Sequence, residues 1–146
     1  MPAHLLRPIP PGVYFEDASA LGTNGPLVVA QLLAAGSTTG QTVLVRAAGS
    51  SSGSMALLVA RVIGLSTIGT TRSSERATVL GDLGVADHIV VSSEPDALNQ
   101  IRSLTAGRGV DIVLDNLGAP DAWTLSVGSL AVGGTAVTSG AKFGAV

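Results

Sequence analysis

The chain has 146 residues, a formal net charge of −2, 46% hydrophobic and 3% aromatic residues, and no cysteine. This length fits one domain with a real core, and the small net charge disfavours a nucleic-acid-binding surface. Disulfides and cysteine-ligated metals are excluded within this sequence, and no apolar run approaches the roughly 18 residues of a membrane helix, so a cytoplasmic protein is expected.

The first twelve residues contain four prolines and predict an extended linker, or the remnant of an upstream domain. Residues 13–146 are expected to form one domain. A short helix is predicted from Phe15 to Leu21, followed by a turn at 23–26. A second helix is predicted from Leu27 to Ala35, because an apolar run there ends at a glycine.

The next stretch, Val43 to Ala47, predicts a buried strand. Small residues follow from Ala48 to Gly53, and an apolar helix is predicted from Ser54 to Gly64. The small-residue loop is a relaxed form of the G-x-G-x-x-G pattern. It would let a diphosphate approach the N–H groups of a helix start, where the helix dipole adds about half a positive charge. The candidate diphosphate ligands are Ser50, Ser51, Ser52 and Gly53.

Four more strands are predicted at 65–71, 88–91, 110–115 and 135–139, alternating with helices. The buried faces of the last two helices are expected to be Leu98, Ile101 and Leu104, and then Trp123, Val127 and Leu130. This alternation predicts an α/β fold, a Rossmann-type doubly wound parallel sheet of about five strands in the order 3-2-1-4-5. Ligands of such sheets bind at the carboxyl ends of the strands.

The end of the second predicted strand favours NADP(H) as the ligand. An NAD site needs a carboxylate about 20 residues after the glycine-rich loop, but here no carboxylate stands between that loop and Glu75. Arg72, between Thr71 and Ser73, suits a dianionic 2′-phosphate. The alternative is a solvated arginine at a strand end, with Ser73 or Ser74 capping the next helix.

Five segments in this order resemble the medium-chain dehydrogenase/reductase superfamily, over nearly the whole chain. They are Val43–Gly53, Thr70–Ser73, Leu83–Val90, Asp111–Gly118 and Leu130–Thr135. The resemblance implies the cofactor domain of a two-domain oxidoreductase that moves hydride between NAD(P)H and an alcohol, aldehyde, quinone or enone. The catalytic domain and a sixth strand are expected to lie outside this sequence.

The resemblance also implies how NADP(H) would lie on the chain. The pyrophosphate is expected on Ser50 to Gly53, and the 2′-phosphate on Thr71, Arg72 and Ser73. The nicotinamide ribose and ring are expected beside Asn116, Leu117, Gly118, Ser139, Gly140 and Ala141. The expected partners are NADPH and a small carbonyl or quinone substrate, with no nucleic acid or membrane. A homodimer is possible, because the edge of the fifth strand would be unpaired.

No metal site is expected. Zinc-dependent members of this superfamily carry a cysteine ligand where this sequence has Thr23 or Asn24. Zinc prefers thiolate, imidazole or carboxylate ligands. The chain is therefore more similar to the zinc-independent quinone oxidoreductases and enoyl reductases.

Arg46 and Asp115 are charged residues in strands that are predicted to be buried. Arg46, inside a buried strand, should either reach the rim of the cleft or pair with Asp111 or Asp115. Asp115 is expected to hold the Asn116 loop by hydrogen bonds.

Two other functions are rivals to an oxidoreductase domain. They are a nucleotide-binding or sensor module without catalysis, and an S-adenosylmethionine-binding methyltransferase-like fold. The latter usually has an acidic residue where Thr71 and Arg72 stand.

Overall fold

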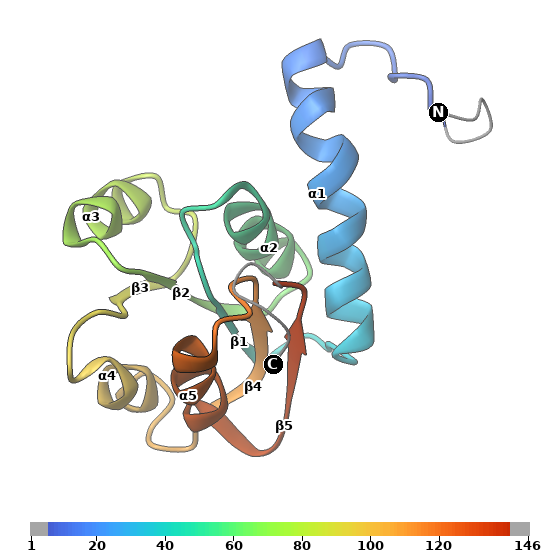
Figure 1. The fold of residues 1–146 in the computed structure, drawn as a ribbon. Coiled ribbons are helices and arrows are strands. Elements are labelled where there is room, and N and C mark those ends of the chain that lie inside the picture. The colour runs from blue at the N-terminus through green and yellow to red at the C-terminus, as the bar shows by residue number, and fades with distance from the viewer. Residues whose placement is uncertain (1–5, 141–146) are drawn as a thin grey trace.

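The computed structural model describes residues 6–140, which form a five-stranded parallel sheet in the order β3-β2-β1-β4-β5 (Figure 1). This confirms the predicted fold class and strand order. The strands are β1 (Thr42–Val45), β2 (Ser66–Thr71), β3 (His88–Val91), β4 (Val110–Asp115) and β5 (Leu130–Thr138). The helices are α1 (Phe15–Ala34), α2 (Ser51–Val62), α3 (Ser74–Asp82), α4 (Ala97–Ser103) and α5 (Pro120–Gly128).

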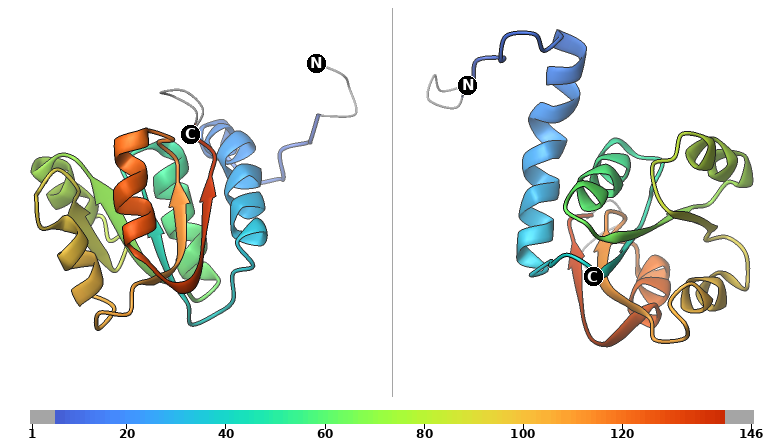
Figure 2. Two further views of the ribbon diagram at one scale, coloured as in Figure 1. Left: turned by 60° about the horizontal axis from the view of Figure 1, so that its bottom comes forward. Right: turned by 180° about the vertical axis from the view of Figure 1, so that it is seen from behind.

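Helices cover both faces of the sheet, and each face has its own apolar core (Figure 2). Side chains alternate along a strand, so Val43 and Val45 of β1 face α1, α2 and α3, whereas Leu44 faces the α4 side. Strands buried on both faces need continuous apolar runs, which is what the sequence provides. None of the helices within residues 6–140 is both long and apolar enough to cross a membrane.

The first helix corrects the sequence-based expectation. We predicted a turn at 23–26, but α1 runs unbroken from Phe15 to Ala34 with Pro26 inside it. Proline removes one intrahelical bond, here to the carbonyl of Gly22. Gly22 is exposed, so water can bond that carbonyl, and a break in the helix is not required. Most of the N-terminal half of α1 is exposed, and its buried residues are Val28, Gln31 and Leu32.

The predicted buried faces of α4 and α5 are partly wrong. Leu104 follows the end of α4 and is 40% exposed, and Val127 of α5 is 47% exposed. Leu130 lies in β5, because α5 ends at Gly128. Among the side chains described on α5 and just after it, the fully buried ones are instead Ser126 and Ser129. Because serine is polar, nothing in the sequence indicated that this face is buried.

The last strand begins earlier than expected. We predicted a turn at Gly133-Gly134 before a strand at 135–139, but β5 runs from Leu130 to Thr138. The register shifts between Val110 and Ile112 of β4, which face Leu130 and Thr135 of β5. Gly133 has φ +82° within this irregularity, a conformation that glycine adopts without steric cost. The glycines therefore form a bulge inside the strand.

Asp111 ties the start of β4 to the start of β1, because its Oδ2 accepts a hydrogen bond from the Thr42 N–H at 2.8 Å. The hydrogen bond from Arg108 lowers the pKa of Asp111, and the Thr42 bond acts in the same direction. A lowered pKa stabilises the fold above the unfolded-state value, about 3.9, and this stabilisation is lost as the pH falls through the folded-state pKa.

We therefore expect Asp111→Asn to be less stable than the wild type at pH 7, with the difference shrinking as the pH falls below about 4. Urea unfolding at a series of pH values measures this difference. Asp82→Asn, at an exposed aspartate at the end of α3, is the control. A constant difference across the pH range would contradict the ion-pair explanation.

Candidate functional site

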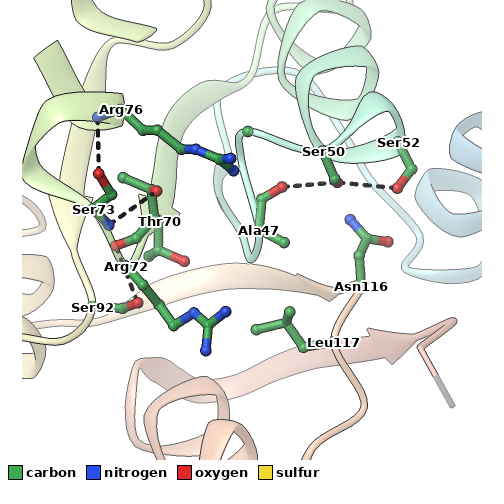
Figure 3. Close-up of a pocket in the computed structure, with 12 residues that line it drawn as sticks. Ala47, Ser50, Ser52, Thr70, Arg72, Ser73, Arg76, Ser92, Asn116 and Leu117 are labelled. Carbon is green, nitrogen blue, oxygen red and sulfur yellow. Dashed lines mark hydrogen bonds between the residues drawn. The ribbon is translucent and has the colours of Figure 1, made fainter. Parts of the chain in front are cut away.

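A cavity of about 580 Å³ lies where β1, β2, β3 and β4 end (Figure 3). The turn before α2, the ends of β2 and β3, the start of α3 and the loop after β4 contribute its walls. Its lining residues are Ala47, Gly49, Ser50, Ser52, Thr70, Thr71, Arg72, Ser73, Arg76, Ser92, Asn116 and Leu117. The predicted rim of the sheet is thus the place where a cavity forms.

The turn between β1 and α2 differs from the predicted loop, because α2 begins at Ser51 and not at Ser54. Ser50 is the N-cap, and its Oγ accepts a hydrogen bond from the Gly53 N–H at 3.0 Å. The Gly53 amide is therefore already bonded. The amides of Ser51 and Ser52 have no carbonyl of a preceding helical turn to bond, so they are the donors that this helix start offers.

Ser50 and Ser52 line the cavity, whereas Ser51 and Gly53 are not among its lining residues. Gly53 is important because it has no Cβ atom. A Cβ at Gly53 would lie 2.2 Å from the carbonyl oxygen of Ala47. Ala47 itself has φ +58°, the left-handed conformation that is uncommon for a side-chain-bearing residue. Gly53 thus allows the sharp turn that brings β1 and α2 together.

We expect Gly53→Ala to destabilise the protein by about 1–3 kcal/mol, because the new methyl group would displace the Ala47 backbone. Chemical denaturation measures the change. The matched control is Gly81→Ala in α3, where nothing lies within 4 Å of the new Cβ and where alanine favours the helix. Equal stabilities of the two variants would contradict this role for Gly53.

A second arginine lies in the wall formed by β2 and α3. Thr71, Arg72 and Ser73, which were predicted to bind the 2′-phosphate, all line the cavity, and so does Arg76, which we did not predict. Figure 3 shows Arg76 reaching from α3 toward the turn at Ala47, while Arg72 extends toward Leu117. The sequence could have indicated Arg76 by its position in the first turn of α3, four residues after Arg72.

Ser73 has a further role, because its Oγ accepts a hydrogen bond from the Arg76 N–H at 3.2 Å and so caps α3. The capping alternative is therefore correct for Ser73. Both arginines line the cavity, and so do Thr71 and Ser92. Ser92, after β3, is another lining residue that the sequence reasoning missed.

The loop after β4 supplies Asn116 and Leu117 to the cavity, whereas Gly118 is buried behind it. Asp115 holds this loop, as expected: its Oδ1 accepts hydrogen bonds from the N–H groups of Leu117 (2.8 Å) and Gly118 (3.1 Å). The predicted hydrogen bonds between Asp115 and this loop are confirmed.

Ser139 and Gly140, predicted to line the same end, lie behind the loop. The Ser139 Oγ donates to the Asn116 Oδ1 at 3.0 Å. A Cβ at Gly140 would lie 2.4 Å from the carbonyl carbon of Leu117, so the two backbones are in close contact. Both residues support the Asn116 loop and are not among the lining residues. Ala141 lies outside the described residues.

Arg46 does not reach the rim of the cavity. Its side chain is buried, with Nε donating to the Thr70 Oγ1 at 3.1 Å and Nη1 donating to the Ser126 Oγ at 2.8 Å. Ser126 in turn donates to the Asp115 Oδ2 at 2.8 Å. Arg46 is therefore linked to Asp115 through a serine hydroxyl, whereas Asp111 takes part in an ion pair at the opposite end of β4.

Comparison with known proteins gives three consistent findings. Residues 53–146 match the family model described as zinc-binding dehydrogenase. The mycobacterial protein Rv1454c, solved in complex with NADPH, is 32% identical, with a TM-score of 0.87, over 100% of this chain and 45% of that one. A quinone oxidoreductase of Pseudomonas syringae pv. Tomato DC3000 is 31% identical, with a TM-score of 0.82, over 96% of this chain and 43% of that one.

A curated relative is the partially reducing polyketide synthase men1 of Menisporopsis theobromae. It is 34% identical over an alignment of 143 residues that covers 94% of this chain and 6% of that protein. The chain therefore spans less than a tenth of this synthase and less than half of the two solved chains. The similarity concerns one region of larger proteins.

The residues present do not fit a zinc site, despite the description of the matching family. The sequence has no cysteine, and the side chains that the structure describes bring no three residues of the types His, Cys, Asp or Glu together as metal ligands. Thr23 and Asn24, at the position discussed above, lie inside α1. The Asn24 side chain donates to the Ala20 carbonyl at 3.4 Å.

Proposed function

Because the chain belongs to the zinc-binding dehydrogenase family of the medium-chain dehydrogenase/reductase superfamily, we propose that it is an NADP(H)-binding domain of an oxidoreductase. The first twelve residues would serve as a linker, and the residues from 13 onward would form the domain. In the protein that contains this domain, hydride would pass between NADPH and a quinone, an enone or another carbonyl or alcohol substrate.

The observation that carries this proposal is the charge of the cavity. Its lining includes two arginines, Arg72 and Arg76, and no carboxylate among the described residues. A carboxylate there would favour the ribose hydroxyls of NAD, whereas guanidinium groups beside hydroxyl groups favour a 2′-phosphate. The Rv1454c complex with NADPH supports the same interpretation, since that protein superposes on the whole of this chain.

The proposed pose follows the shape of the cavity. The 2′-phosphate lies between Arg72 and Arg76, and the pyrophosphate lies at the amides that begin α2. The nicotinamide end lies beside Asn116 and Leu117. When bound, the nicotinamide supplies or accepts the hydride, while the residues of this chain bind and orient it.

The substrate, a cytoplasmic location and a homodimer belong to the proposal as well. A homodimer is consistent with the position of β5 at the edge of the sheet. The sensor module remains the second candidate, because the described residues line the cavity with cofactor-binding groups but do not identify an acid or base for catalysis.

Calorimetric titration of the chain with NADPH, NADH and S-adenosylmethionine tests the proposal. We expect saturable binding of NADPH, weaker binding of NADH and no binding of S-adenosylmethionine. Equal or tighter binding of NADH would overturn the assignment of the arginines. Binding of NADPH without reduction of quinones or enones by the full-length protein would favour the sensor module.

A further inference from the structure

A buried glutamine from α1 meets the loop that forms the nicotinamide end of the cavity. Gln31 is 3% exposed, and its Nε2 donates to the Asn116 Oδ1 at 3.0 Å and to the Ser139 Oγ at 2.9 Å. These contacts join three segments that are far apart in the sequence. Neither the composition of α1 nor the loop motifs pointed to Gln31.

The hydrogen bonds in this cluster determine which way the Asn116 amide faces. Its Oδ1 accepts from both Gln31 and Ser139, whereas its Nδ2 donates to the backbone carbonyl of Arg46 at 3.5 Å. Figure 3 shows the Asn116 nitrogen on the side of the Ala47 turn. Asn116 therefore presents an N–H donor toward the part of the cavity that is proposed to hold the dinucleotide.

The opposite arrangement has a specific electrostatic cost. If Gln31 turned its oxygen toward Asn116, then Asn116 would have to turn its nitrogen toward Gln31. The Asn116 oxygen would then face the Arg46 carbonyl oxygen at the 3.5 Å separation of the present hydrogen bond, and two acceptors would meet. The observed arrangement avoids this contact, although it leaves the buried Oε1 of Gln31 without a partner among the described residues.

We infer that Gln31 is a positioning residue that keeps the Asn116 amide nitrogen, and not its oxygen, facing the bound dinucleotide. This inference rests on the proposed function, because it concerns the same cavity. An N–H at this position attracts a phosphate or ribose oxygen, whereas a carbonyl oxygen would repel it. Gln31 thus tunes affinity for the part of the cofactor that lies beyond the adenosine.

Two substitutions by side chains of similar size to glutamine separate the effect of the hydrogen-bond donor of Gln31 from the effect of its packing. Gln31→Met removes the donor, so the contacts with the Arg46 carbonyl and the Ser139 hydroxyl remain to orient Asn116. Gln31→Glu replaces the donor by an acceptor, which forces Asn116 to turn its nitrogen away from the cavity. Gln100→Glu, on α4 away from the cavity, is the matched control.

The probes are NADPH and adenosine 2′,5′-bisphosphate, which contains the 2′-phosphate but lacks the pyrophosphate and the nicotinamide. We expect Gln31→Glu to raise the Kd for NADPH about tenfold or more, the size expected for one hydrogen bond to a charged group. The Kd for adenosine 2′,5′-bisphosphate should change less than about twofold. Retained binding of this fragment also shows that the variant is folded, and Gln31→Met carries the test if Gln31→Glu does not fold.

A double-mutant cycle tests whether Gln31 affects NADPH binding through Asn116. In the background of Asn116→Ala, Gln31→Glu should have no further effect on NADPH binding, because the group that it reorients is gone. Equal effects of Gln31→Glu in both backgrounds would overturn the inference, as would equal loss of both probes or unchanged binding of NADPH. If the wild type itself does not bind NADPH, the proposed function fails first.

Discussion

Replacing Arg72 and Arg76 together by alanine is expected to remove the preference of the chain for NADPH over NADH. The double variant should bind NADPH about 10–100-fold more weakly than the wild type, since charge-assisted hydrogen bonds to phosphate contribute about 1.5–3 kcal/mol each and exposure reduces this value. Binding of NADH, which has no 2′-phosphate, should change little. Titration of both nucleotides against the wild type and the variant gives the two ratios.

The matched control is Arg102→Ala on α4, which lies outside the lining of the cavity and donates to the Gly128 carbonyl. This variant should keep the wild-type preference. The two single variants show how much of the loss of NADPH binding comes from Arg72, which the sequence identified, and how much comes from Arg76, which the structure added. A double variant that still prefers NADPH would show that the 2′-phosphate, if bound, is held elsewhere.

Replacing Asp115 by alanine is expected to cause the largest loss of stability, about 3–5 kcal/mol, the range for removing one partner from a buried charged network. Asp115 is fully buried and accepts from Leu117, Gly118 and Ser126. Without it, two loop amides lose their acceptor, and Arg46 loses the carboxylate that it reaches through Ser126. Urea unfolding of the variant and the wild type measures the difference.

Asp115→Asn is the matched variant for this prediction. Its amide oxygen can still accept from the loop N–H groups, so the loss should be smaller than for Asp115→Ala, although the charge that balances Arg46 is gone. A stability of Asp115→Ala within about 1 kcal/mol of the wild type would contradict the proposed network.

Most of the fold could be predicted because the strands of a parallel sheet have a strong local signal. Predicted strands at 88–91 and 110–115 have the bounds of β3 and β4, since an apolar run between turn residues has few other solutions. The order of the strands followed from right-handed connections. Most of the cavity could be predicted for the same reason, because most of its lining residues lie at the strand ends or just after them.

The misses have two causes: a helix tolerated a proline at an exposed turn, and tertiary contacts overrode the local pattern at Ser126 and Gln31. Pro26 reads as a helix start but lies within a helix that tolerates one missing bond at an exposed turn. Ser126 reads as a surface residue but is buried, because it bridges Arg46 and Asp115. Gln31 belongs to an apolar run, and nothing near it in the sequence indicates its partners 85 and 108 residues away.

The most direct test of the account is a ³¹P NMR titration of NADP⁺ bound to the wild-type chain. Two neighbouring guanidinium groups favour the dianionic form of a phosphate, so the pKa of the 2′-phosphate should fall below its usual value of about 6 on binding. The account predicts this lowered pKa and its return toward the free value in the Arg72→Ala, Arg76→Ala double variant. A bound 2′-phosphate that titrates as it does in free NADP⁺ would show that these two arginines do not hold it.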